Sequence, residues 1–96
     1  MKAIYKYPIS VTDHQNVMLP PGARIIKVAF QYIDDMQQLN LWAIVDPTAV
    51  IGTEITEVWI YGTGHMHNEF EGEYFDTVFD SDGYVWHVFL KHVGIG

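Results

Sequence analysis

The fold is decided by the stretch YFDTVFDSDGYVWHVFLKH, residues 74–92, near the end of the chain. Two runs rich in β-branched and aromatic residues flank its centre, DSDG (residues 80–83). An Asp-Gly pair supplies the positive φ that a tight turn requires, so the stretch predicts an antiparallel hairpin. In the second arm, alternation places His87 on one face and Trp86 on the other, each with apolar neighbours. We therefore expect this strand to be covered on both faces, as in a sandwich or small barrel.

Similar runs precede this hairpin. Tyr5 and Tyr7 alternate with Lys6, and such a period of two indicates a strand with one wetter face. Strands or extended segments are predicted over residues 3–9, 15–19, 24–33, 39–45 and 54–61.

The connections are marked by turn-forming residues. Pro20-Pro21-Gly22 predicts a turn, because proline fixes its own φ and cannot donate to a strand ladder. The other predicted connections are a polar hairpin loop at 34–38, a loop at 46–52 and an exposed acidic loop or twisted edge at 69–73.

One strand has an irregular pattern. Under strict alternation, Ile55 cannot share a face with both Val58 and Ile60. A bulge, or a strand start near Glu57, would resolve the conflict.

These elements indicate a single domain, residues 1–96, without internal repeats or linkers. The predicted fold class is all-β with little or no helix, a compact antiparallel β-sandwich or small barrel of about six to seven short strands.

Composition restricts the class of protein. Apolar residues make up 49% of the chain and aromatic residues 15%, which predicts a packed core. Cysteine is absent, so neither disulfides nor thiolate metal ligands are expected. The formal net charge of −7 disfavours binding to nucleic-acid phosphates, and no polynucleotide partner is expected. The sequence shows no signal-peptide pattern and no window that predicts a membrane span, so we expect no membrane association.

A candidate ligand site lies where the strand at 54–61 meets a glycine-framed turn. Gly62 and Gly64 allow a sharp bend and a close approach of a ligand to the backbone. A pocket with aromatic walls could stack a planar ring, hydrogen-bond its edge and meet a phosphate through the turn amides. The predicted ligand-binding residues are Trp42, Trp59, Gly62, Thr63, Gly64, His65, Trp86 and His87, and a homo-oligomer interface could complete the pocket. An alternative interpretation of His87 is a hydrogen-bonded core residue.

A metal-assisted hydrolase or cupin-like enzyme is the competing class, with His65, His67 and Glu71 as the ligands. This set overlaps half of the first cupin motif, but Trp59 and Val78 stand where that motif has glycines, and the second motif is absent. Neither serine lies in a nucleophile-elbow pattern. The sequence therefore predicts no catalytic residue, no resident metal and no cofactor.

An acidic group follows the glycine turn. Its simplest interpretation is a solvated edge that discourages aggregation. The alternative is a surface for docking on a basic partner protein, carried by Glu69, Glu71 and Glu73.

Four blocks resemble a family of small uncharacterised phage and prophage proteins. They occur in the family's order and are LPPGARII (19–26), LWAIVD (41–46), GTGH (62–65) and WHVF (86–89). The resemblance implies a phage origin and a location in the cytoplasm of a bacterial host. Small acidic phage proteins of this kind are often accessory factors that blunt host defences.

Sequence and resemblance together favour an accessory protein that acts by binding, most simply as an inhibitor of a bacterial defence system. The expected partner is a host protein or a small nucleotide-like signal. A minor structural protein of the virion is a further alternative.

Overall fold

The computed structural model describes residues 1–48 and 52–95 of the chain, and these residues form seven strands and no helix. The strands are β1 (Ala3–Ile9), β2 (His14–Leu19), β3 (Arg24–Ile33), β4 (Met36–Val45), β5 (Glu54–Gly62), β6 (Glu73–Phe79) and β7 (Val85–Ile95). The all-β prediction is confirmed. No described segment forms a helix that could cross a membrane.

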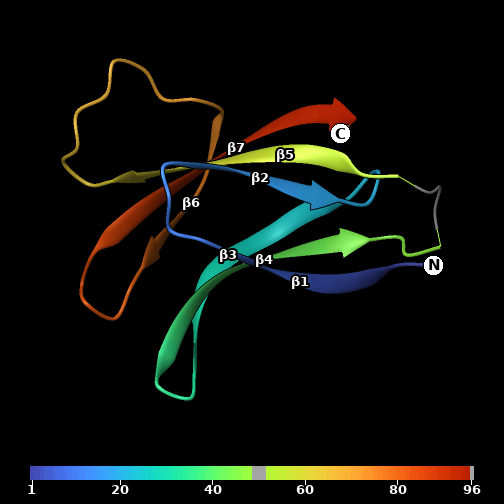
Figure 1. Cartoon of the computed structure of the whole chain (residues 1–96), viewed down its shortest axis with the longest axis horizontal. Coiled ribbons are helices and arrows are strands. Elements are labelled where there is room, and N and C mark those ends of the chain that lie inside the picture. Colours follow the sequence, from blue (N-terminus) through green and yellow to red (C-terminus); the bar gives the residue numbers. More distant parts are fainter. Residues whose placement is uncertain (49–51, 96) are drawn as a thin grey trace.

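The strands form two antiparallel sheets. Sheet A has the order β1-β4-β3, and sheet B has the order β2-β5-β7-β6. The sheets pack as a small sandwich whose Cα atoms extend 41 × 37 × 16 Å. Both marked termini lie at one end of the molecule, and the connection between β5 and β6 projects at the other end (Figure 1). We call this connection, residues 63–72, the covering loop.

A narrow aliphatic core lies between the sheets. In β4 the odd-numbered residues Leu39, Leu41, Ala43 and Val45 point inward, and their side chains are at most 2% exposed. Val58 in β5 and Val88 in β7 meet them from sheet B. Because side chains alternate along a strand, the even-numbered residues of β4 form the outer face of sheet A.

The β3–β4 connection is tighter than predicted. The loop expected at 34–38 is wrong, because the chain turns within Asp34 and Asp35 and β4 begins at Met36. Both aspartates adopt positive φ, 51° and 63°. Two consecutive positive φ values characterise the two-residue hairpin turns whose twist matches that of the strands. The pairing of the two strands is antiparallel, as expected.

The irregularity expected in β5 lies in the neighbouring strand, β7. β5 is continuous from Glu54, and Thr56 takes the inward position ahead of Val58. The pairing register with β7 shifts between Ile55 and Thr56, where the partner residue changes from Gly94 to His92. Ile55 therefore lies on the outer face, and the extra residue belongs to β7 rather than to a bulge near Glu57.

The predicted hairpin at 74–92 is present. β6 pairs with β7, and Gly83 supplies the positive φ of the turn, 88°. The Asp80 carboxylate accepts hydrogen bonds from the amides of Asp82 and Tyr84, each at 2.9 Å, and from Trp86 Nε1 at 3.1 Å. Desolvation tends to raise the pKa of Asp80, but these hydrogen bonds outweigh it, so the pKa is lowered from its ordinary value.

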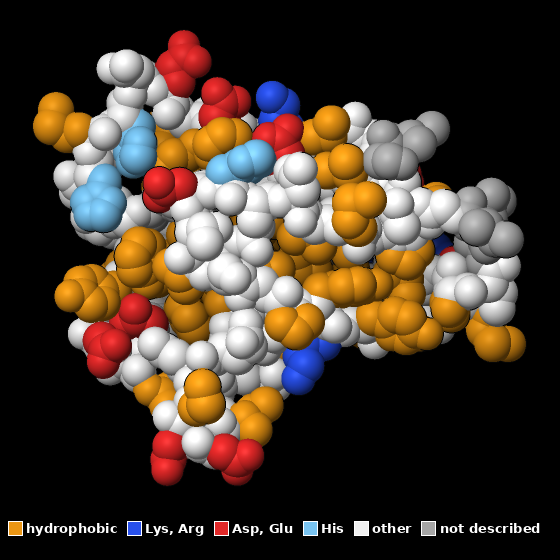
Figure 2. All heavy atoms as spheres, viewed as in Figure 1, with side chains coloured by type: hydrophobic (Ala, Val, Ile, Leu, Met, Phe, Trp, Pro, Cys, Tyr) orange, Lys and Arg blue, Asp and Glu red, His pale blue; other side chains and the backbone are white. Residues whose placement is uncertain are grey.

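Histidine and acidic side chains gather over the covering loop and the neighbouring strands in the upper left of Figure 2. Hydrophobic side chains occupy a broad area in the middle and right of the same view. The end of the molecule that carries the covering loop is therefore chemically distinct from the rest.

Candidate functional site

A hollow of about 290 Å³ lies on the outer face of sheet B, beside the covering loop. Four aromatic rings wall it, those of Tyr61, Phe70, Tyr74 and Phe89. Its polar side chains are Thr63, His65 and His87, and the backbone of Gly62 and Gly64 completes it. We call it the aromatic hollow. Its volume is close to the lower limit for small-molecule pockets, about 300 Å³.

Strand register explains why these side chains meet. Tyr61 in β5 lies opposite His87 in β7, and Tyr74 in β6 lies opposite Phe89. All four alternate with inward residues such as Val88, which is fully buried. The outer face of three adjacent strands therefore forms the floor and two walls of the hollow.

The aromatic rings contact one another closely. Phe70 stacks on Phe89 with centroids 5.7 Å apart and an interplanar angle of 19°. Tyr61 meets both rings edge to face, at 4.9 Å from Phe70 and 5.3 Å from Phe89. Such aromatic pairs contribute about 0.5–1.5 kcal/mol each beyond the burial of area. Phe70 is the member supplied by the covering loop, so the hollow exists only when the loop is seated.

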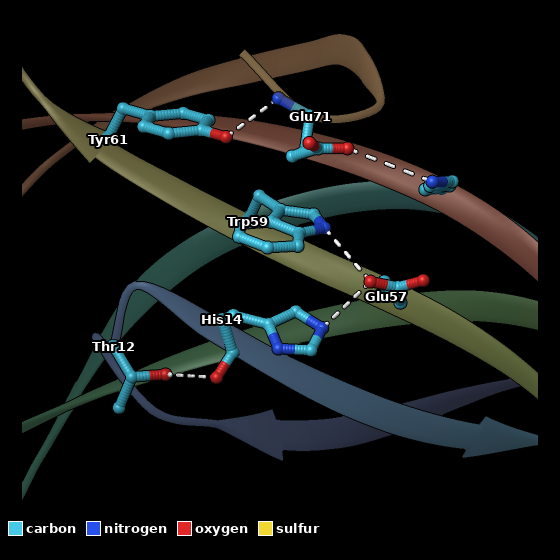
Figure 3. Close-up of polar contacts among 7 residues, drawn as sticks. Thr12, His14, Glu57, Trp59, Tyr61 and Glu71 are labelled. Atoms are coloured by element: carbon cyan, nitrogen blue, oxygen red, sulfur yellow. Dashed lines mark hydrogen bonds and ion pairs between the residues drawn. The ribbon is translucent and has the colours of Figure 1, made fainter. Parts of the chain in front are cut away.

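Besides these aromatic contacts, two polar contacts of Glu71 hold the covering loop on sheet B. The Glu71 amide donates a hydrogen bond to the Tyr61 hydroxyl at 2.8 Å, and the Glu71 carboxylate lies 3.7 Å from Lys91 Nζ (Figure 3). Gly72 passes directly over β7, where a Cβ atom would lie 2.6 Å from the carbonyl oxygen of Leu90. The loop can therefore lie this close to β7 only because residue 72 is a glycine.

His87 is held by two threonine hydroxyls. Thr63 Oγ1 lies 2.7 Å from Nε2, and Thr77 Oγ1 lies 3.0 Å from Nδ1. Tyr74 continues the chain, with its hydroxyl 2.7 Å from Thr77 Oγ1. Both ring nitrogens therefore already have partners, so the imidazole is fixed in place, as in the interpretation of His87 as a hydrogen-bonded residue.

The glycine turn uses its own amides. The Thr63 amide donates to the carbonyl of Val85 at 3.3 Å, and the His65 amide donates to the carbonyl of Gly62 at 3.3 Å. The His65 ring lies against Gly62, where an added Cβ would be 2.9 Å from it. We expected the amides of this turn to be free to bind a phosphate. Two of them, those of Thr63 and His65, already donate to backbone carbonyls.

The predicted ligand-binding residues fall in four places. Gly62, Thr63, Gly64, His65 and His87 meet at the aromatic hollow. Trp86 points inward and lines two smaller neighbouring hollows with Gly62 and His65.

The other two tryptophans lie outside the aromatic hollow. Trp59 is on the outer face of sheet B, where it stacks on His14 at 4.2 Å and donates to Glu57 at 3.2 Å (Figure 3). Trp42 lies on the outer face of sheet A, paired with Lys6 and Lys27. Trp42 is distant from the hollow because its strand, β4, belongs to sheet A. Alternation along a strand does not reveal which sheet the strand joins.

The sequence interpretation missed Phe70, Tyr74, Thr77 and Phe89. Phe89 shares a face with His87 by simple alternation, so that member could have been found. Phe70 lies in a loop without periodicity, and nothing local predicts that it stacks on β7.

The alternative metal ligands do not converge. His67 packs edge to face on Tyr61 at 4.8 Å, whereas the Glu71 carboxylate faces Lys91. Among residues 1–48 and 52–95, no three His, Asp or Glu side chains are grouped so that they could hold a metal ion. The set His65, His67 and Glu71 is therefore not assembled as a site.

The predicted docking residues differ in their surroundings. Glu69 and Glu73 are exposed, and Glu71 is half-buried beside Lys91. Two exposed carboxylates thus flank, in the sequence, the one that anchors the covering loop.

No curated protein and no solved structure is similar enough to the chain to match it. One family model does match, over residues 1–94, and its description is a domain of unknown function. The match covers the whole of both sheets except the last residue of β7. The chain therefore belongs to the family DUF7352.

Proposed function

We propose that this protein acts by binding, and that the aromatic hollow holds the planar ring of a small nucleotide-like ligand. The observation that carries the proposal is the combination of stacked aromatic walls with two polar side chains, Thr63 and His87, in one hollow. Hydrogen bonds to Thr63 and Thr77 fix His87 there. Apolar walls with a few convergent polar groups are the usual construction of a small-molecule site.

The aromatic walls can stack on the planar ring of the ligand, and the polar side chains can form hydrogen bonds with the edge of that ring. Phe70 and Tyr74 are 55% and 58% exposed, so a ligand can reach their faces. Stacking of a base on an aromatic side chain contributes about 1–3 kcal/mol. The Thr63 hydroxyl can exchange hydrogen bonds with ring nitrogens or exocyclic groups, because a hydroxyl both donates and accepts. His87 holds this hydroxyl in place, and both of its ring nitrogens are already paired with threonine hydroxyls.

The charges around the hollow disfavour binding of a phosphate group but not of the ring. No Lys or Arg lines the hollow as the described residues form it, and Glu69 and Glu73 lie exposed near it. A phosphate group would therefore gain little here and would be repelled by the carboxylates. The ligand we propose is recognised by its ring, with any phosphate left in solvent.

The biological role we propose follows from the resemblance to small phage proteins. A binding protein made in the cytoplasm of an infected bacterium would remove a nucleotide-like signal from solution, and thereby inhibit the defence system that uses this signal. Family and fold do not themselves specify this role, since one fold serves many functions.

Isothermal titration of nucleosides and of their mono- and triphosphates tests the proposal. We expect a nucleoside to bind at least as tightly as its triphosphate. Tyr74→Ala and Phe70→Ala should each weaken binding about tenfold, the loss expected for one stacking contact. Tyr32→Ala is the matched control, because Tyr32 is 60% exposed but lies on β3 in the other sheet. Binding that requires the phosphates, or that is unchanged in Tyr74→Ala, would contradict the proposal.

A second candidate is docking of the covering loop on a basic host protein. It is favoured by the exposed carboxylates of Glu69 and Glu73 beside Met66, which is 96% exposed. Affinity capture from a bacterial lysate with wild-type protein and with Glu69→Lys/Glu73→Lys would test it. A partner retained equally by both proteins would exclude this surface.

A further inference from the structure

Charge is segregated along this chain. The first 27 residues contain four of the five cationic side chains and one acidic residue, Asp13. Residues 54–82 contain eight of the twelve acidic residues and no Lys or Arg. The four cations are Lys2, Lys6, Arg24 and Lys27. Because β1 and β3 belong to sheet A, whereas β5 and β6 belong to sheet B, this segregation in sequence becomes a segregation between the sheets.

On sheet A the cations surround an apolar centre. Lys6 and Lys27 lie on either side of Trp42 in the strand register, and Ile4 and Arg24 lie on either side of Ile44. These residues alternate with buried ones such as Leu41, so they lie on the outer face. Ile4 is 60% exposed. We call this surface the basic face, formed by Ile4, Lys6, Arg24, Lys27, Trp42 and Ile44.

The complementary surface includes two walls of the aromatic hollow, Phe70 and Tyr74. Met66, Phe70 and Tyr74 are 96%, 55% and 58% exposed, and the carboxylates of Glu69 and Glu73 lie among them in the sequence. We call these five residues the acidic face. Exposed apolar groups bordered by charge mark interaction sites, and the basic face and the acidic face are two such surfaces of opposite sign.

We propose that a second copy of this chain docks its basic face on the acidic face of the first. Opposite charges steer the two copies together, and the apolar centres lose contact with water on docking. The two surfaces differ, so the contact is head-to-tail, and each added copy presents a free surface for the next. Docking in this way does not depend on a ligand, although it places the Trp42 of one copy at the mouth of the hollow of another.

A second copy fits the basic face better than a polyanion does. Stacking platforms for single strands present successive aromatic side chains, and Trp42 is the single aromatic of this face, beside the aliphatic Ile4 and Ile44. Those aliphatic side chains match the exposed Met66 and Phe70 instead.

Sedimentation velocity without ligand tests the proposal on three proteins. The wild type should gain mass as its concentration rises at about 50 mM salt, and lose it at about 500 mM salt, where charges are screened within a few ångström. Lys6→Glu/Arg24→Glu and Glu69→Lys/Glu73→Lys should each lower the association constant at least about tenfold. Lys27 is left unchanged because it pairs with Asp76 at 3.1 Å.

A mixture of the two charge-reversed variants provides the decisive test of head-to-tail docking. An equimolar mixture of the two variants should associate again, because each reversed face now meets a face of opposite charge. Restored association also shows that both variants are folded. Asp13→Lys/Asp82→Lys is the matched control for Glu69→Lys/Glu73→Lys, because it makes the same change in net charge outside both faces. It should leave association within about twofold of wild type. A wild type that stays monomeric at low salt, or a mixture that fails to associate, would overturn the proposal.

Discussion

The outer faces of the two sheets differ in how far the chain itself covers them. The outer face of sheet B is partly covered by its own chain, because the ten residues 63–72 connect β5 to β6 and return over β7. The outer face of sheet A receives no such cover from its hairpin, because β3 and β4 are joined within Asp34 and Asp35. The length of one connection thus decides whether a sheet face becomes an enclosed site or an open surface.

Substitution of Gly72, the last residue of the covering loop, should have the largest effect on this difference between the two sheets. Gly72→Ala places a Cβ atom 2.6 Å from the Leu90 carbonyl oxygen, at a positive φ of 78°. We expect the free energy of unfolding to fall by about 2–4 kcal/mol and ligand binding to be lost, as measured by urea denaturation and titration.

Gly64→Ala is the matched control for this substitution. Gly64 also has a positive φ, 86°, but an added Cβ would meet nothing within 4 Å. Only the backbone strain remains, about 1 kcal/mol. Equal losses from the two substitutions would show that the closeness of the loop to β7 is not important.

Removal of one hydroxyl should loosen the loop without unfolding the sheet. Tyr61→Phe leaves the ring in place but removes the acceptor of the Glu71 amide. We expect a loss of about 1 kcal/mol and faster amide hydrogen exchange within residues 63–72, measured by mass spectrometry. Tyr32→Phe, at a tyrosine of β3 that is 60% exposed, should change stability by less than about 0.5 kcal/mol. Unchanged exchange in Tyr61→Phe would show that the other contacts of the loop, such as Phe70 on Phe89, seat it without this hydrogen bond.

Acid should weaken the hairpin of β6 and β7, and this is the smallest expected effect. The pKa of Asp80 is lowered in the folded protein, so its contribution to stability is present above the ordinary value of 3.8 and is lost as the pH falls through the folded pKa. Asp80→Asn should therefore flatten the pH dependence of stability below about pH 4. A similar acid loss in Asp80→Asn and wild type would assign the effect to other carboxylates.

Local patterns predicted much of the fold. The bounds of β1 and β3 agree with the alternation in the sequence, and the DSDG turn lies where the Asp-Gly signal placed it. The turn at Asp34 and Asp35 was missed, because aspartate adopts positive φ less readily than glycine and the polar residues that follow resemble a loop.

The candidate site could be predicted only in part. Alternation indicates that His87 and Trp86 face opposite ways, but it does not reveal which sheet a strand joins. Trp42 was therefore grouped with residues from which the sandwich separates it. Phe70 was missed because its contact with Phe89 depends on the path of a loop, which no periodicity encodes.

The order of strands also determines how long the new chain waits for its partners during synthesis. β2 ends at Leu19, but its partner β5 is complete only at Gly62. That gap of roughly 40 residues takes about 2 to 8 s at a synthesis rate of ~5–20 residues per second. β1 likewise waits for β4. During this interval Lys6 and Pro8 are the residues of β1 that discourage pairing with other unfinished chains, since charge and proline both disfavour edge-to-edge association.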